Sequence, residues 1–411
     1  MARSQLSRAQ AAVGSVHVSA PDCGDVLPAG EGDRVCGLAV LLEVRGFAPM
    51  HELELVKPDG RRMTLYSRTP IPAGIRAHNP ATGTVRADPH LRWHPLRHEW
   101  VAYATHRQAR TFQPPPQYDP LRASNDPVDE TELPAGDYDI AVFDNLFPVL
   151  SADANAPPAI VVPTEAARGH CEVVVFTQDA SESLAELGVD RVELLLEVWG
   201  RRTDAIIERM PDIQYVLPFE NRGTEVGVTL HHAHGQIYAY THLPPIPRQM
   251  HDAERDHLAA TGRPLLESLI EAEISDGRRV IYLSDDAVAF VPAWARYPYE
   301  VWVAPRKRAE NFGSLTGAIR RELSRALLTV LRKYDGLWGT HFPYIMAWYQ
   351  TPHLEGYEGA CHLHAEFFPP YRMRGRLKFL AGTELAAGLF ANDTLPEDKA
   401  SELQAVQIVL D

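Results

Sequence analysis

The chain has 411 residues, of which 45% are hydrophobic and 23% are charged, an ordinary globular balance that excludes a disordered or collagen-like protein. A length of this size predicts two to three domains. Forty Lys and Arg residues stand against 54 Asp and Glu residues, so the net charge is −14. That sign opposes a broad basic face for nucleic acid, and we expect no nucleic-acid partner, although a local basic pocket for one nucleotide is compatible with it.

The N-terminal region carries little periodic pattern. Residues 1–34 are rich in Ala, Ser, Gly and Asp, which favours a mobile leader. Residues 68–91 and 113–136 are dense in Pro, Asp and Asn and are typical of loops, because proline does not serve an interior strand. We therefore assign residues 1–91 to a leader and N-terminal extension of uncertain structure.

The remaining chain predicts the same order of elements twice. A Val-rich and Phe-rich pattern indicates strands, and a 3.6-residue period indicates one long helix in each copy. The first copy has strands at 139–148 and 172–177, a helix at 184–209 and strands at 213–220 and 231–240. The second has strands at 280–291 and 300–304, a helix at 315–334 and strands at 342–349 and 361–368. The fold class is α+β, with two duplicated halves (92–245 and 246–411), each an antiparallel sheet with helices packed across it.

The last strands of the two copies carry matching polar rows, 130 positions apart. His232-Ala-His234-Gly-Gln236 in the first copy corresponds to His362-Leu-His364-Ala-Glu366 in the second. Alternate residues of a strand share a face, so each row presents three polar groups on one side of its sheet.

The first row is the candidate site. Gly223 and Gly227 precede it, in a connection where backbone amides can approach an anion. Imidazole is largely neutral at pH 7 and forms a labile bond to phosphorus, so this row suits nucleophilic attack on a phosphate. A structural role for the histidines, or a metal held by His232 and His234, stays open from the residues alone, although no third ligand lies nearby in sequence.

Four cysteines, Cys23, Cys36, Cys171 and Cys361, are isolated and suggest neither a zinc knuckle nor a disulfide framework. The most apolar early run, 35–42, is too short to span a bilayer. We therefore expect a cytoplasmic protein with reduced thiols and no membrane contact.

The run FENRGTEVGVTLHHAHGQIYA resembles the active-site segment of galactose-1-phosphate uridylyltransferases, in the histidine-triad superfamily. Four further segments resemble that family in the same order: 92–112, VFDNLFP at 142–148, FVPAWARYPYEV at 290–301 and LKFLAGTE at 377–384. The resemblance covers residue 92 to the end, and we recognise no counterpart of residues 1–60.

The resemblance implies a hexose-1-phosphate uridylyltransferase that works by double displacement. His234 would attack the α-phosphorus of UDP-glucose, glucose 1-phosphate would leave, and a second sugar 1-phosphate would take the uridylyl group. His232 would be its neighbour in the row, and Gln236 would donate its amide to the phosphoryl oxygens.

Family contacts to the substrate carry over to nine matching positions. The implied nucleotide and phosphate contacts are Asn145, Asn221, Gly227 and Thr229. Contacts partly supplied by the other subunit of a homodimer would be Arg107, Arg110, Lys378, Phe379 and Glu384.

The metals of the family are not expected in this chain. Its zinc positions read Asp119, Arg122 and Ala180, which leaves only His232, and an Asp119–Arg122 ion pair could replace the metal. The positions of a second metal read Ile246, Tyr349, His364 and Glu366, so only His362, His364 and Glu366 remain as weak candidate ligands. We expect that no cofactor is required.

Two other functions remain compatible with these residues. One is a nucleotide phosphorylase or hydrolase on the same fold, with phosphate or water as acceptor. The other is a non-catalytic dimer that binds a UDP-sugar.

Overall fold

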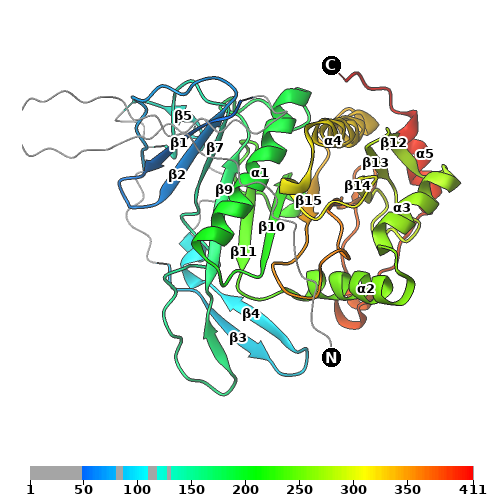
Figure 1. Ribbon diagram of the computed structural model, residues 1–411, viewed down its shortest axis with the longest axis horizontal. Coiled ribbons are helices and arrows are strands. Elements are labelled where there is room, and N and C mark those ends of the chain that lie inside the picture. Colours follow the sequence, from blue (N-terminus) through cyan, green and yellow to red (C-terminus); the bar gives the residue numbers. More distant parts are fainter. Residues whose placement is uncertain (1–48, 80–86, 110–117, 127–130, 411) are drawn as a thin grey trace, which may run out of the picture. The chain divides into compact units, whose positions relative to one another are not determined.

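A computed structural model describes residues 49–79, 87–109, 118–126 and 131–410 (Figure 1). The expected leader at 1–34 and Arg110 lie outside the described residues. The described chain is built around one sheet of eleven strands, and every neighbouring pair in it is antiparallel. In sheet order the strands are β1 (His51–Val56), β2 (Arg62–Ser67), β7 (Ile140–Asp144), β9 (Gly169–Val175), β11 (His234–Tyr240), β10 (Tyr215–Arg222), β15 (Tyr344–Tyr349), β16 (His364–Phe368), β14 (Val301–Pro305), β13 (Ala287–Phe290) and β12 (Val280–Leu283).

The α+β class is confirmed, and so is the correspondence of the two histidine rows. Strand β11 begins at His234 and strand β16 begins at His364, the second histidine of each row. The two halves do not carry separate sheets, because β10 pairs with β15 and joins them into one surface, with Phe219 opposite Ala347. Strands β1 and β2 lie in the region assigned to the N-terminal extension, and they lengthen the sheet through the pairing of β2 with β7.

Two long helices cover one face of the sheet. Helix α1 (Val189–Arg209) and helix α4 (Gly317–Trp338) pack against each other and share one hydrophobic core with the strands (Figure 1). Trp199 of α1 and Leu327 of α4 are fully buried there, together with Ile237 of β11 and Phe367 of β16. The alternate residues of β11 and β16, which include His234 and His364, therefore point to the opposite face.

The opposite face is covered differently in the two halves. Over the second half lie helix α2 (Pro245–Thr261) and helix α3 (Leu265–Asp276), and α3 packs Leu266 and Ile270 against Phe290. Over the first half lies the segment that contains Leu121 and Leu133. Figure 1 shows α2 and α3 with the second half of the sheet. The first half is the side on which a cavity stays open.

The other elements are short. The small sheet β4–β3–β8 consists of Glu99–Tyr103, His90–His94 and Thr164–Ala166, and two further pairs are β5–β6 (Ala123–Ser124 and Leu133–Pro134) and β17–β18 (Tyr371–Met373 and Arg376–Leu377). Helix α5 spans Pro396–Ala405, and the helical turns are η1 (Thr105–Ala109), η2 (Thr224–Val226), η3 (Phe312–Ser314) and η4 (Thr383–Ala387). Within the described chain no helix is both long and apolar enough to cross a membrane.

Candidate active site

Two glycines near the histidine strand β11 allow close approaches of the backbone, one beside β15 and one beside β10. Gly223, at the turn after β10, has a φ of 97°, and a Cβ there would lie 2.6 Å from the Cβ of Pro343. Gly235 lies between His234 and Gln236, where a Cβ would come within 2.9 Å of the carbonyl oxygen of Phe219. A side chain at Gly235 would push β11 away from β10, and one at Gly223 would collide with Pro343 just before β15, so both glycines are sterically required.

His234 has a fixed tautomer. Its Nδ1 lies 2.7 Å from the backbone carbonyl oxygen of His232. A carbonyl only accepts hydrogen bonds, so Nδ1 carries the proton and Nε2 carries the lone pair. The ring is half-buried and lines a cavity of about 120 Å³ on the face opposite α1. His234 can therefore act as a nucleophile without losing a proton first.

His232 is buried beneath this site and is bonded at both ring nitrogens. Nδ1 lies 2.7 Å from Oδ2 of Asp119, and Nε2 lies 2.7 Å from the carbonyl oxygen of Thr177. Burial disfavours the charged ring, but the hydrogen bonds to Asp119 and Thr177 outweigh it and raise the pKa of His232. Burial likewise opposes the charge of Asp119, yet the bond from His232 lowers the pKa of that carboxyl. Because both partners of the ring are acceptors, His232 is an imidazolium. Its two hydrogen bonds fix the residue, and its own backbone carbonyl accepts the hydrogen bond from His234.

The cavity gathers five of the residues predicted from the sequence. His234, Gln236, Asn145, Thr229 and Arg107 all line it. Asn145 accepts a hydrogen bond from the Phe147 amide at 2.9 Å, and Arg107 donates to the Phe147 carbonyl at 2.7 Å. These two bonds shape the loop after β7 into a wall of the cavity.

Gln236 presents its amide nitrogen as a donor. The hydroxyl of Tyr238 donates to Oε1 of Gln236 at 3.2 Å, which assigns the oxygen end of the amide. The NH₂ end is then available to an anion beside His234. This is the geometry needed to hold charge on phosphoryl oxygens while the phosphorus is attacked.

Glu132 was missed by the sequence analysis, although it lines the cavity. Its Oε2 lies 2.6 Å from Nζ of Lys57 and 3.0 Å from Nη2 of Arg61, and the side chain of Lys57 is fully buried. Both cations come from the β1–β2 hairpin, 75 and 71 positions away in sequence. No local pattern marks such a pair, because each partner alone resembles an ordinary surface charge.

Other residues predicted to bind substrate do not line this cavity in the single chain. Asn221 lies on β10, paired with Ile345 of β15, and Gly227 ends the turn η2 with a φ of 81°. Lys378 and Glu384 lie 3.7 Å apart in the C-terminal segment, and Phe379 is 76% exposed. Their roles remain predictions.

The residues at the family's zinc positions do not fit a zinc ion. Ala180 has no donor atom, Arg122 is a cation, and both nitrogens of His232 bind protein acceptors. Asp119 bonds His232 directly, so a carboxylate–imidazolium contact stands where metal ligands are expected. The Asp119–Arg122 ion pair stays a prediction.

The second row also lacks a complete metal site at the family positions. His364 is buried between Trp302 and Tyr349, whose rings lie 5.0 and 5.3 Å from it and nearly parallel to it. Glu366 is buried and pairs with Arg296 at 3.2 Å. Ile246 has no donor atom and is 50% exposed. Of the four positions, Ile246 and Tyr349 therefore do not fit a metal ion, and only His364 and Glu366 carry the usual ligand atoms.

Fold and site together define a class: a duplicated α+β protein whose first half presents a candidate histidine nucleophile to a cavity. The model of the galactose-1-phosphate uridyl transferase N-terminal domain matches residues 81–244, and that of the C-terminal domain matches residues 248–409. The chain belongs to this family.

Relatives and solved structures extend the comparison. The chain is 34% identical to a galactose-1-phosphate uridylyltransferase of Thermotoga maritima, over 77% of this chain and 98% of the relative. It is 35% identical to one of Streptomyces lividans, over 76% of this chain and 86% of the relative. A solved uridylyltransferase structure superposes with a TM-score of 0.68 at 28% identity, covering 77% of this chain and 98% of that one.

Proposed function

We propose that the protein is a hexose-1-phosphate uridylyltransferase, which exchanges the uridylyl group between UDP-glucose and galactose 1-phosphate or a related sugar phosphate. The observation that carries the proposal is the geometry of His234, with Nδ1 bonded to the His232 carbonyl at 2.7 Å and the ring lining the cavity beside Gln236. Relatives named galactose-1-phosphate uridylyltransferase at 30–35% identity over most of the chain support the substrate class.

The first half-reaction forms a covalent intermediate. The lone pair of His234 Nε2 attacks the α-phosphorus of UDP-glucose, and the bond from that phosphorus to the bridging oxygen breaks. Glucose 1-phosphate leaves with the electron pair, and a uridylyl-histidine remains. The positive charge that develops on the ring is stabilised through Nδ1–H by the His232 carbonyl, and the Gln236 amide stabilises the phosphoryl oxygens.

The second half-reaction is the reverse with another acceptor. A phosphate oxygen of the second sugar 1-phosphate attacks the same phosphorus, the P–N bond breaks, and His234 recovers its lone pair. A phosphoanhydride is exchanged for a phosphoanhydride, so no further energy source is needed. Asn145, Thr229 and Arg107 are the lining residues that we assign to the nucleotide.

The reaction proceeds without a metal at the family's zinc position, as part of the same proposal. Support comes from the Asp119–His232 pair, which fixes the ring of His232. The backbone carbonyl of the same residue orients His234. No step of either half-reaction requires a Lewis acid in this scheme.

A homodimer with shared sites, in the cytoplasm and without nucleic acid, completes the proposal. Arg110, Lys378, Phe379 and Glu384 are the contacts assigned to the partner's site, and Asn221 and Gly227 to the substrate once the dimer forms. Several apolar side chains near Glu384 are exposed in the single chain, and Phe379 and Leu389 are two of them. Their exposure supports a surface that the partner subunit covers. The described cysteines Cys171 and Cys361 are free thiols, which supports a reducing compartment.

The test is the mass of the intact protein after incubation with UDP-glucose. We expect a uridylyl adduct on the native protein and on His231→Ala, whose exposed side chain precedes the row, and none on His234→Ala. Folded native protein that shows label exchange without an adduct would overturn the histidine mechanism.

Product analysis separates the alternatives. Label exchange between UDP-glucose and glucose 1-phosphate supports the transferase. Release of UMP without a second sugar phosphate would indicate a hydrolase, and tight UDP-sugar binding without turnover would indicate a binding protein.

A further inference from the structure

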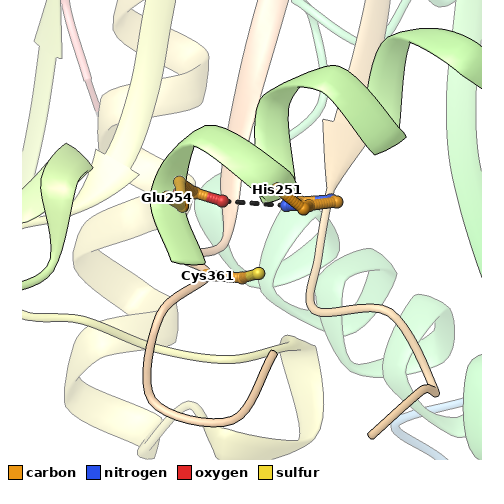
Figure 2. Close-up of side chains that lie close together, drawn as sticks. All are labelled: His251, Glu254 and Cys361. Carbon is orange, nitrogen blue, oxygen red and sulfur yellow. Dashed lines mark hydrogen bonds and ion pairs between the residues drawn. The ribbon is translucent and has the colours of Figure 1, made fainter. Parts of the chain in front are cut away.

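Three metal-binding side chains of different chemistry meet on the face of the sheet opposite α1 and α4. His251 and Glu254 lie one turn apart on α2, and Cys361 lies three residues before β16. Their donor atoms are all within 4.8 Å of one another, and all three residues are at least 97% buried. Figure 2 shows the imidazole of His251, the carboxylate of Glu254 and the sulfur of Cys361 close to one another.

We propose that His251, Glu254 and Cys361 bind a zinc ion through three protein ligands. A tetrahedral zinc with Zn–S of about 2.3 Å and Zn–N of about 2.0 Å places its ligands roughly 3.3 to 3.7 Å apart. The donor atoms of this cluster all lie within 4.8 Å of one another, so small side-chain shifts would bring them to that spacing. None of the three residues stands at a position where the family's metals are expected, although the cluster lies beside the second histidine row, because the charge of Glu254 acts on His364.

The charge of the cluster fits a divalent ion. The Glu254 carboxylate is buried with His251 as its partner, at 2.8 Å from Nδ1, and no other Lys, Arg or His of the described chain stands within ion-pair distance of it. Binding forms a Zn–S bond, and the Cys361 thiol releases its proton to solvent. One thiolate, one carboxylate and a neutral imidazole then balance the charge of the ion, which a buried site requires.

The orientation of the histidine also fits a ligand. Its Nδ1 faces Glu254, and its Nε2 lies 3.4 Å from the hydroxyl of the buried Tyr215 on β10. A histidine that binds zinc through one nitrogen commonly gives the other N–H to a neighbouring oxygen, which fixes the ring. The thiolate and imidazole favour zinc over magnesium or calcium, which prefer oxygen ligands. A water molecule takes the fourth position in this assignment.

A second group of the same kind shows what excludes a metal. Asp144, His170 and Glu172 also lie within 4.8 Å of one another. There Arg202 donates to both carboxylate oxygens of Glu172, at 2.6 and 3.0 Å, so the negative charge is already compensated. We therefore assign no metal to that group. The distinguishing feature of Glu254 is that no arginine or lysine of the described chain pairs with it.

The zinc would connect two segments of the second half that are about a hundred residues apart in sequence, the helix α2 and the loop that contains Cys361. Helix α2 follows β11, the strand of His234, and Cys361 precedes β16, the corresponding strand of the second half. Clamping one to the other would stabilise the arrangement of the strands without touching the substrate cavity.

Metal analysis of tag-free, full-length protein after zinc reconstitution and gel filtration tests the site. We expect about one zinc per chain in the native protein and in Cys171→Ser, the matched control at the other buried thiol. Cys361→Ser and Glu254→Gln should lose that zinc. Retention of the full zinc content by folded Cys361→Ser would overturn the proposal.

Cobalt substitution in the native protein gives a readout that does not depend on how the variants fold. Co²⁺ in this site should show a thiolate charge-transfer band in the near ultraviolet and intense visible bands of tetrahedral cobalt. Folded native protein that binds neither zinc nor cobalt, or cobalt that lacks the thiolate band, would also overturn the site. Chelation should lower the Tm of the native protein and of Cys171→Ser, and leave that of Cys361→Ser unchanged.

Discussion

The two histidine rows share the same hydrogen bond from a ring nitrogen to a backbone carbonyl, but their surroundings differ. Nδ1 of His234 bonds the carbonyl of His232 at 2.7 Å, and Nδ1 of His364 bonds the carbonyl of His362 at 2.8 Å. His234 lines a cavity, whereas His364 is 1% exposed and lies between two aromatic rings. The local chain thus sets the tautomer in both copies, and the covering of the sheet decides which copy can meet a substrate.

The largest expected effect separates the two histidines by function. His234→Ala removes the nucleophile, and we expect kcat to fall by roughly 10⁴-fold or more. His364→Ala should keep kcat within about threefold when folded but lower the free energy of unfolding by about 3 kcal/mol, because a buried ring is lost. Label-exchange assays and urea unfolding measure the two. Loss of the uridylyl adduct in folded His364→Ala would contradict the assignment of chemistry to the first row alone.

The next effect concerns the walls of the cavity beside His234. Lys57→Met breaks a buried ion pair and leaves Glu132 less compensated, so we expect a loss of about 3 kcal/mol of stability and a higher KM for UDP-glucose. Thermal unfolding and steady-state kinetics measure both.

The matched control is Arg263→Met, which removes an exposed pair with Glu271 of the same 2.6 Å length. It should leave the stability and the KM unchanged. An equal loss in the two variants would show that burial of the Lys57 pair has no special weight.

A smaller effect tests the Asp119–His232 pair through pH. Asp119→Asn should cost about 2 kcal/mol near pH 6 and lower kcat by loosening the carbonyl that orients His234. The pKa of His232 is raised, so its contribution is present below its unfolded pKa and is lost as the pH rises through its folded value. The pKa of Asp119 is lowered, so its contribution is lost as the pH falls through its folded value.

Urea unfolding at several pH values measures the contribution of the Asp119–His232 pair to the free energy of unfolding. The stability difference between native protein and Asp119→Asn should be largest between the two folded pKa values and should shrink on either side. A difference that does not vary with pH would contradict the ion pair.

The smallest effect lies where the two halves meet. Glu220 is buried on β10, and burial raises its pKa to about 7, although Arg222 and the Tyr344 hydroxyl act against this. The folded protein then holds a proton that the unfolded chain loses, so stability falls as the pH rises from the ordinary value of 4.5 toward 7. Glu220→Gln should remove this dependence and gain about 1 kcal/mol at pH 8. A steeper loss with pH in the variant would reverse the sign.

Much of the frame could be predicted from periodicity. The strands of the large sheet from 139 onward and the two long helices follow strong apolar patterns, and the offset of 130 positions located both β11 and β16. The single strand expected at 280–291 is instead the hairpin β12–β13, and the short strands β8, β17 and β18 were not predicted. Helices α2, α3 and α5 were not predicted, because each begins at or directly after a proline and buries few residues, so its pattern is weak.

The site was predictable only where its residues lie in one strand or in a family segment. His234 and Gln236 share a strand, and Asn145 and Thr229 follow from the resemblance. The bond from Asp119 to His232 spans 113 positions, and the one from Lys57 to Glu132 spans 75. Such contacts depend on how distant segments fold together, and no local spacing encodes them.

The pairing of β10 with β15 has a consequence for the evolution of the molecule. Four residue pairs, from Phe219 with Ala347 to Arg222 with Tyr344, join the halves through their backbones. Either half made alone would present a bare strand edge, open to the edge of another copy and hence to aggregation. Main-chain hydrogen bonds between β10 and β15 therefore make each half depend on the other. The second half is needed to cover the edge of β10, even though its own His364 is closed to substrate.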